Sequence, residues 1–253
     1  MSSSSASAST TSRPSTTAAS ATASPPSAVR PSTAGPATTA ATTPPASSAP
    51  AVAPLSAAAR RAGLVDVRTV VPDAVVDLRY ATSANFTHVR LYPAGARCLV
   101  HTSMRSGLRT AAARLRQQGY RLVFWDCYRP HPVQVQMFRI VPDPEYVARP
   151  GPYARSHESG RSIDVTLAHA RPGTCTTRVQ GHCLLGMGTG FDDFSDRAHA
   201  YATDGVGAGA RAHRAILRAA MLDGGLAVYV GEWWHFDGPG ADVGRPFLDA
   251  PLH

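Results

Sequence analysis

The chain has 253 residues, of which 25 are basic and 17 acidic, giving a formal net charge of +8, and every residue in the basic count is an arginine. These arginines are scattered and no recognisable nucleic-acid-binding motif accompanies them, so the composition argues against a nucleic-acid partner. No apolar run is long enough to cross a membrane, and the first residues lack the charged start and apolar core of a secretory signal.

The N-terminal part of the chain differs in composition from the rest. Residues 1–55 consist almost entirely of Ser, Thr, Ala and Pro, with only Arg13 and Arg30 charged and no aromatic residue. Such a segment cannot bury enough apolar surface to offset the entropy lost on ordering it. We therefore predict a disordered tail over residues 1–55 and one folded domain over residues 56–253, whose roughly 200 residues suffice for a core.

The predicted elements of this domain begin at Leu64. Alternation of apolar and polar side chains favours a short strand over residues 65–67, and valines around a Pro-Asp turn favour further short strands between residues 70 and 78. Residues 80–86 are largely polar and are predicted to form a loop. The domain therefore opens with short strands and loops rather than with a long element.

A helix and a strand follow. Residues 104–118 carry apolar side chains at 3.6-residue spacing and end before Gly119, which predicts a helix. The apolar residues 121–125 predict a strand that runs into Asp126-Cys127-Tyr128-Arg129-Pro130. An arginine at the end of a buried strand, followed by a proline, is well placed to point into a cleft. Alternatively, Arg129 forms a structural ion pair with Asp126.

The second half of the domain continues this alternation. The spacing of apolar residues predicts helices over residues 133–140 and 211–223, and apolar runs predict strands over residues 163–167 and 226–230. Residues 141–155 are rich in Pro, Gly and Arg and are predicted to form a loop. No nucleotide-type glycine loop follows the first strand. We therefore predict an α+β fold, in which helices flank a small antiparallel or mixed central sheet that carries the site.

The stretch Gly231–Phe236 holds the strongest chemical signal near the C-terminus. Glu232 precedes His235 by three residues, and three aromatic residues surround them. A carboxylate and an imidazole are costly in such a dry environment unless each has a partner. A metal ion would satisfy both, although a hydrogen bond to each other or to the backbone would also do so.

A second stretch strengthens the metal interpretation. His157 is followed seven residues later by Asp164, which lies in a mostly apolar run. Two histidines and one aspartate form a three-ligand set for a catalytic zinc, with the fourth position left for water. Glu232 then remains as a candidate general base. Because side chains three apart on a strand point to opposite faces, a bulge, bend or strand end must separate Glu232 from His235, and His157 should lie in a loop.

The four cysteines permit two disulfides with three connectivities. Cys98 precedes the first predicted helix and Cys127 ends the next strand, so these two can meet, while Cys175 and Cys183 bracket a short loop. Four reduced thiols are an alternative, as is a structural zinc bound by Cys175, His182 and Cys183. Disulfides would indicate an oxidising compartment, so we favour an extracellular or cell-envelope location over the cytoplasm.

Together these motifs resemble the D-alanyl-D-alanine dipeptidases of the VanX type, within the wider family of zinc D,D-peptidases. That family has the signature His-x-x-Gly-x-x-x-Asp followed much later by Glu-x-x-His, and both halves stand in this chain at residues 157–164 and 232–235. Further matches, in the same order as in the family, are Tyr80-Ala81-Thr82, Asn85-Phe86-Thr87, the Trp125–Pro130 stretch, and Met187-Gly188 with Phe191-Asp192. The resemblance covers residues 64–240.

The resemblance implies an α+β fold and zinc-dependent hydrolysis of the D-alanyl-D-alanine dipeptide. It implies that His157, Asp164 and His235 bind one Zn²⁺ per chain. It also implies that Glu232 acts as general base and that Arg129 stabilises the oxyanion that develops on the scissile carbonyl.

The resemblance further suggests residues that bind the substrate, a small D,D-dipeptide or cell-wall peptide. Tyr80 would line the pocket and Asp192 would hold the substrate ammonium, although a turn or helix-cap role is also common for such an aspartate. The family commonly has a serine, associated with the amino end of the substrate, where this chain has Arg155. Because an arginine repels ammonium and attracts carboxylate, strict dipeptide specificity is open to question.

Two alternative functions follow from the same residues. The ligand set also serves D,D-carboxypeptidases and endopeptidases that act on larger peptidoglycan peptides, and these would need a broad, open groove. A non-catalytic cell-wall-binding module with a vestigial zinc is the other alternative, but such a module has no need for Glu232.

Overall fold

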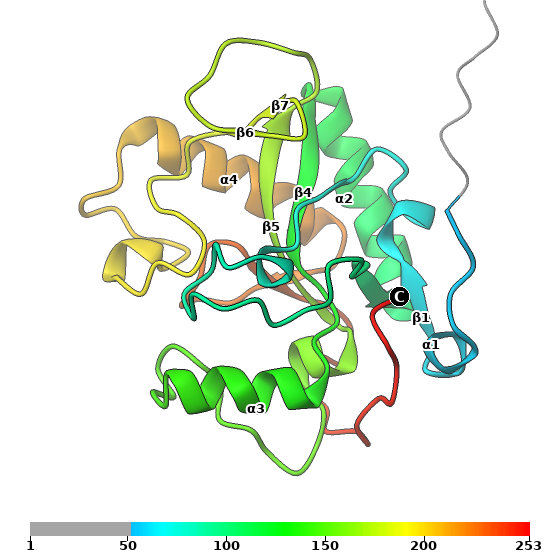
Figure 1. Ribbon diagram of the computed structural model, residues 1–253. Helices are drawn as coiled ribbons and strands as arrows, with labels where there is room; N and C mark the ends of the chain where they lie inside the picture. The colour runs from blue at the N-terminus through cyan, green and yellow to red at the C-terminus, as the bar shows by residue number, and fades with distance from the viewer. Residues whose placement is uncertain (1–51) are drawn as a thin grey trace, which may run out of the picture. The chain divides into compact units, whose positions relative to one another are not determined.

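The structure is a computed structural model that describes residues 52–253 (Figure 1). Most of the disordered tail that the composition predicts over residues 1–55 lies outside these described residues. The described part has the predicted α+β fold, with a mixed five-stranded sheet and flanking helices. No helix within residues 52–253 combines the length and apolar character that a membrane span requires.

The central sheet contains, in spatial order, β2 (Val75–Val76), β4 (Tyr120–Asp126), β5 (Ser162–His169), β9 (His235–Asp237) and β8 (Ala227–Val228). Strand β2 runs parallel to β4, and all other neighbouring strands in this sheet are antiparallel. Strands β4 and β5 are buried along most of their length, which accounts for their nearly continuous apolar runs.

The register of the sheet brings polar side chains from three strands together. Asp164 on β5 is paired with Asp126 on β4 and with His235 on β9. A register shift between Phe124 and Asp126 places Asp126, rather than Trp125, opposite Asp164. Directly paired residues of neighbouring strands project from the same face. The sheet therefore sets two carboxylates and an imidazole side by side.

Helices α2 (Arg105–Gln117) and α4 (Ala208–Asp223) pack against each other, and they contact the central strands β4 and β5, respectively (Figure 1). Their apolar faces are buried, as their 3.6-residue spacing predicts. Helix α2 approaches the end of α4 closely at Gly107, where an added Cβ would lie 2.4 Å from the carbonyl oxygen of Gly224. Any side chain at residue 107 would therefore push the two helices apart.

Helix α3 (His131–Ile140) lies apart from α2 and α4 (Figure 1). It begins at His131 rather than at residue 133, because Pro132 is compatible with the first turn of a helix. Residues 141–155 contain no helix and only an isolated bridge at Ala154, so the predicted loop is confirmed. We refer to residues 141–155 as the rim loop.

Short elements complete the described fold. Strand β1 (Leu64–Asp66) pairs with β3 (Leu99–His101), β6 (Arg178–Val179) pairs with β7 (His182–Cys183), and helix α1 (Ala57–Arg61) precedes β1. The 3-10 helices are η1 (Val67–Thr69), η2 (Arg79–Ala81), η3 (Thr102–Met104), η4 (Ser156–Ser159) and η5 (Asp196–Ala198).

Two strand predictions are wrong in extent. Val70 and Val71 do not form a strand, because both of their amides bond to the carbonyl of Val67 and the chain curls there. The strand predicted over residues 226–230 shrinks to β8, because the chain turns immediately after it. In both places a local turn overrides the preference of valine for extended structure.

All four cysteines form disulfides. Cys98 is bonded to Cys127 with Cα atoms 5.3 Å apart, and Cys175 to Cys183 with Cα atoms 5.7 Å apart. The first bridge joins the start of β3 to the residue that follows β4, and the second closes the β6–β7 hairpin. The structure therefore has the disulfide arrangement rather than four reduced thiols or a zinc bound by Cys175, His182 and Cys183.

Candidate active site

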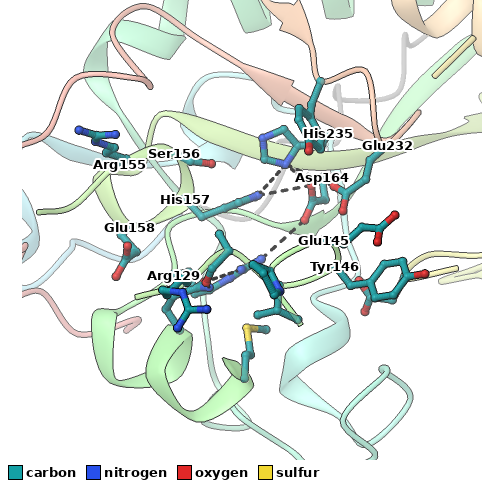
Figure 2. Close-up of a pocket in the computed structure, with 18 of the residues that line it drawn as sticks. Arg129, Glu145, Tyr146, Arg155, Ser156, His157, Glu158, Asp164, Glu232 and His235 are labelled. Atoms are coloured by element: carbon teal, nitrogen blue, oxygen red, sulfur yellow. Dashed lines mark hydrogen bonds and ion pairs between the residues drawn. The ribbon is translucent and has the colours of Figure 1, made fainter. Parts of the chain in front are cut away.

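One cavity of about 680 Å³ collects every site residue that the sequence predicts. These residues are Tyr80, Arg129, Arg155, His157, Asp164, Asp192, Glu232 and His235. Figure 2 shows that His157, Asp164 and His235 point toward one another within it. The separate sequence motifs therefore converge on a single place in the fold.

The 3-10 helix η4 brings His157 to the cavity. Its Nδ1–H donates to the carbonyl oxygen of Cys127 at 2.8 Å. Because a carbonyl can only accept, this bond fixes the tautomer and leaves the lone pair of Nε2 directed into the site. His157 lies outside the regular strands, as predicted, and follows Ser156, whose φ of 45° marks a tight turn into η4.

His235 is the first residue of β9, and its imidazole is held by Asp237 on the same strand. Its Nε2 lies 3.1 Å from Oδ1 of Asp237, which also accepts a hydrogen bond from the hydroxyl of Ser162. A neutral imidazole that donates to Asp237 presents the lone pair of its Nδ1. That nitrogen lies 3.1 Å from Oδ1 of Asp164 and 3.1 Å from Nε2 of His157.

Three electron-donating atoms thus meet at one point, and they fit a zinc ion. Nε2 of His157, Oδ1 of Asp164 and Nδ1 of His235 all lie within 4.8 Å of one another. With the other imidazole nitrogens donating elsewhere, a bound cation would hold these three acceptors together. Two imidazoles and a carboxylate form the ligand set of a catalytic zinc site with a position left open.

The charges of the cluster agree with a cation site. Burial alone would lower the pKa of His235, but hydrogen bonds to Asp164 and Asp237 and the nearby Glu232 raise that pKa to about 10. Burial opposes ionisation of Asp164, yet the adjacent histidines hold the pKa of Asp164 well below its usual range. The cluster therefore keeps its carboxylate ionised and attracts positive charge.

Glu232 faces the same point because the chain breaks its extended structure between β8 and β9. Its amide donates to the carbonyl of Tyr229 at 3.3 Å in a turn, and His235 then begins the next strand. Oε2 of Glu232 lies 3.7 Å from Nδ1 of His235. The predicted strand end between the two residues is confirmed.

The surroundings of Glu232 also change its pKa. Burial and the charge of Asp164 raise the pKa of Glu232, despite the opposing attraction of His235. A raised pKa suits a general base.

The two tryptophans of this stretch fix the turn. Trp233 and Trp234 are only 2% and 1% exposed, respectively. The indole Nε1–H of Trp233 donates to the hydroxyl of Thr189 at 2.7 Å, and its amide donates to the carbonyl of Ala198 at 2.9 Å. Aromatic packing therefore anchors Glu232 at the cavity wall, and Trp234 lines the cavity itself.

Arg129 both forms the ion pair with Asp126 and lines the cavity. Its Nε and Nη2 donate to Oδ2 of Asp126 at 3.0 and 2.7 Å. Nη2 also lies 3.9 Å from Oδ2 of Asp164. Burial acts against the charge of Arg129, but the surrounding carboxylates raise its pKa well above the ordinary value. Arg129 therefore does both things that the sequence suggested: it faces the cavity and it pairs with Asp126. Its charged guanidinium lies beside Asp164.

Tyr80 and Asp192 meet elsewhere on the cavity wall. The hydroxyl of Tyr80 donates to Oδ1 of Asp192 at 3.1 Å. Burial, together with the charges of Asp164 and Glu232, raises the pKa of Asp192 well above its ordinary value. A buried carboxyl group in such a negative environment would be stabilised in its ionised form by a cationic group of a ligand.

Arg155 lies at the rim and is exposed to solvent. In Figure 2 its side chain extends away from His157, Asp164 and His235. Across the rim, the ring of Tyr146 stacks on Phe194 with centroids 4.6 Å apart, and Phe194 packs on Phe86 at 5.2 Å. The rim loop therefore forms an aromatic edge on one part of the cavity mouth.

Sequence reasoning did not assign Asp126, Gln134 or Asp237 to the site. Asp126 is fully buried and accepts from the hydroxyl of Tyr92 at 2.6 Å as well as from Arg129. For Asp126 and Asp237, the only signal in the sequence was that each stands within three positions of a predicted site residue. Each is also held by a residue that is distant in the sequence, and the spacing of one motif cannot reveal such a partner: Tyr92 for Asp126, Ala148 for Gln134 and Ser162 for Asp237.

Comparison with known proteins supports the same interpretation. A family model described as Peptidase_M15, D-ala-D-ala dipeptidase, matches residues 60–253, a region that includes all eight predicted site residues. A D-alanyl-D-alanine dipeptidase of Escherichia coli (strain K12) is 35% identical over 178 residues, covering 70% of this chain and 86% of that protein. Proteins of the same name are 32% identical in Streptomyces coelicolor over 183 residues and 29% identical in Enterococcus faecalis over 182 residues, each covering 63% of this chain and 83% of the relative.

Proposed function

This chain belongs to the Peptidase_M15 family of D-ala-D-ala dipeptidases, and we propose that its cavity binds D-alanyl-D-alanine and hydrolyses the peptide bond. The observation that carries this proposal is the convergence of Nε2 of His157, Oδ1 of Asp164 and Nδ1 of His235, with Glu232 beside them. Peptidases of this family depend on zinc in general, and we assign one Zn²⁺ per chain to these three ligands.

The protein supplies the proton transfers of this reaction. A bound zinc would activate a water molecule and polarise the scissile carbonyl. Glu232 is not needed as a ligand, and its raised pKa makes it a stronger base than an ordinary carboxylate. In the proposed mechanism, Glu232 accepts a proton from the attacking water and then donates it to the leaving amine.

In the proposed mechanism, Arg129 stabilises the negative charge that develops on the scissile carbonyl oxygen. Its guanidinium is fixed by Asp126, lies beside Asp164 and remains charged. A donor that is oriented before the reaction stabilises an oxyanion without reorganising during it, and loss of one such donor typically costs about 100- to 1000-fold in rate.

Two charged residues distinguish the ends of the substrate. We assign Asp192, held by Tyr80, to the ammonium group, because ionisation of this buried carboxyl group is favoured by a nearby cation. Arg155 places a positive charge at the rim, where it attracts a carboxylate and repels an ammonium. This pairing of charges suits a zwitterionic peptide.

The size of the cavity favours a second candidate substrate. D-Alanyl-D-alanine has only about 11 non-hydrogen atoms, whereas cavities of roughly 300–1,000 Å³ accommodate drug-sized ligands. At about 680 Å³ this cavity has room beyond the dipeptide. A longer peptidoglycan peptide that ends in D-alanyl-D-alanine is therefore the alternative, as in a D,D-carboxypeptidase.

One assay separates these functions. The zinc-loaded protein is incubated with D-Ala-D-Ala, with L-Ala-L-Ala and with an N-acylated tripeptide ending in D-Ala-D-Ala, each with and without a chelator. Hydrolysis of the D,D-dipeptide alone supports the dipeptidase, and faster hydrolysis of the acylated peptide supports the alternative. Absence of hydrolysis of all three by zinc-loaded protein would reject both and leave a binding module.

A further inference from the structure

Gln134 on α3 is a buried cavity residue to which the proposed mechanism gives no role. Its side chain is 4% exposed and lines the cavity beside Arg129. Oε1 of Gln134 accepts from Nη1 of Arg129 at 2.7 Å, and its Nε2 donates to the carbonyl oxygen of Ala148 at 2.6 Å. The amide group of Gln134 therefore links Arg129, to which the mechanism gives a role, with the rim loop.

The chemistry of the two partners fixes the orientation of this amide. A guanidinium has only donors, and a backbone carbonyl has only acceptor sites. The amide oxygen must face Arg129 and the amide nitrogen must face Ala148. A flipped amide would set donor against donor and acceptor against acceptor, which is costly for buried groups.

On the Arg129 side, Gln134 binds the one guanidinium nitrogen that Asp126 does not bind. Nε and Nη2 of Arg129 are held by Asp126, whereas Nη1 is held by Gln134. The planar guanidinium is thus bonded on two sides, which fixes its rotation as well as its position. Without Gln134, the group could pivot about its bonds to Asp126.

On the loop side, Gln134 supplies an unusual tether. Within the described part of the chain, it makes the only hydrogen bond that joins residues 142–153 to the remainder of the fold. The other hydrogen bonds of this segment run to Asp143 within it. Packing adds the stacking of Tyr146 on Phe194 and the burial of Val147.

We propose that Gln134 is a positioning residue that couples the seating of the rim loop to the orientation of Arg129. With the loop seated, the carbonyl of Ala148 holds the amide of Gln134, and the amide in turn holds the guanidinium toward the site. When the loop lifts, Gln134 loses one of its two anchors and Arg129 loses its second restraint. This inference rests on the proposed role of Arg129 in hydrolysis.

The first experiment replaces Gln134 with an apolar residue of similar length. Gln134→Met removes both hydrogen bonds, and kcat for D-Ala-D-Ala should fall about 10- to 100-fold, the scale of a misoriented catalytic group. KM should change less than about 3-fold, because the contact that is weakened acts in the transition state. Gln136→Met is the matched control, since Gln136 lies on the same helix but is exposed. Unchanged kcat in folded, zinc-loaded Gln134→Met would overturn the proposal.

A second variant separates the two hydrogen bonds. Gln134→Glu still accepts from Arg129, but its carboxylate cannot donate to the carbonyl of Ala148. Chymotrypsin should then cleave after Tyr146, whose side chain is already exposed, faster than in the wild type, because local opening of the loop lets its backbone enter the protease active site. Its kcat should also fall. A loosened loop with wild-type kcat would show that loop seating does not reach Arg129.

A double-mutant cycle tells this inference apart from the proposed function. Arg129→Lys keeps a charge beside Asp126 but loses the planar fork. If Gln134 acts through Arg129, Gln134→Met should lower kcat less than about 2-fold in the Arg129→Lys background. Full additivity would overturn the coupling alone, and unchanged kcat in Arg129→Lys would overturn the proposed role of Arg129. Should Gln134→Met misfold, Gln134→Glu takes its place in the cycle.

Discussion

Asp164 and His235 are paired directly across β5 and β9, and Oδ1 of Asp164 lies 3.1 Å from Nδ1 of His235. These residues are 71 positions apart in the sequence, so only the register of the sheet brings them together. A slip of one residue would send His235 to the other face. Any metal binding by this cluster would therefore depend on correct assembly of the sheet.

The first prediction concerns the metal ligands. His157→Ala removes the nitrogen that faces Asp164 and His235, so zinc binding should be lost together with hydrolysis of D-Ala-D-Ala. His131→Ala is a suitable control, because His131 is a half-buried histidine that pairs with Glu158 rather than with the cluster. Zinc content per chain is measured by elemental analysis. Full zinc content in the double variant His157→Ala/His235→Ala would contradict the ligand assignment.

The clustering of His157, Asp164 and His235 could be anticipated from the sequence because their chemistry is concentrated in two short motifs. His157 and Asp164 are seven residues apart, and Glu232 and His235 are three apart, so each half is visible in one stretch. The need for a break after β8 also followed from strand geometry alone.

The residues that support this cluster could not be predicted in the same way. Asp126 faces Asp164 only because β4 carries a register shift before it, and no residue pattern marked that shift. Gln134 reaches Ala148 across a loop, and its role depends on how α3 is placed. Packing between distant elements determines these contacts.

The second prediction concerns Asp237, which orients His235. Asp237→Asn keeps the size of the side chain but removes the negative charge beside Nε2 of the imidazole. Affinity for zinc should fall about 10- to 100-fold, as is typical when the hydrogen-bond partner of a ligand is altered. A competition titration with a fluorescent zinc chelator measures this, and Asp242→Asn at an exposed position nearby is the control. Equal affinities of the two variants would contradict the orienting role.

The third prediction concerns the two disulfides. Cys98–Cys127 closes a segment of 29 residues and Cys175–Cys183 one of 8. Loss of loop-closure entropy then stabilises the folded state by roughly 3–4 kcal/mol for the first bridge and roughly 2–3 kcal/mol for the second. Urea unfolding of the two double Cys→Ala variants compares these free energies.

The first disulfide should also affect the metal. The carbonyl of Cys127 accepts the Nδ1–H of His157, so freeing the end of β4 should weaken zinc binding. Removal of Cys175–Cys183, which lies in the β6–β7 hairpin, should leave zinc affinity unchanged. Equal zinc affinities in both folded double variants would show that the backbone at Cys127 is held without its bridge.

The fourth prediction concerns Arg155. Arg155→Ser removes the positive charge at the rim, so KM for D-Ala-D-Ala should rise about 2- to 5-fold, the scale of an exposed charge pair. The C-terminal amide of the same dipeptide has no carboxylate and should show no such rise. High salt should reduce the difference between wild type and variant. An equal change for both substrates would mean that Arg155 does not recognise a carboxylate.

The last prediction concerns Glu232, whose Oε2 lies 3.7 Å from Nδ1 of His235. Glu232→Gln retains size and hydrogen-bonding reach, so fold and zinc content should be preserved. The amide cannot accept the proton of water, and kcat should therefore fall at least about 100-fold. KM should change far less, because the lost interaction belongs to the transition state. A purely structural Glu232 would give the opposite pattern: a lower melting temperature or lost zinc, with normal turnover per zinc-loaded molecule. Metal content, melting temperature and kcat measured on one preparation decide between the two.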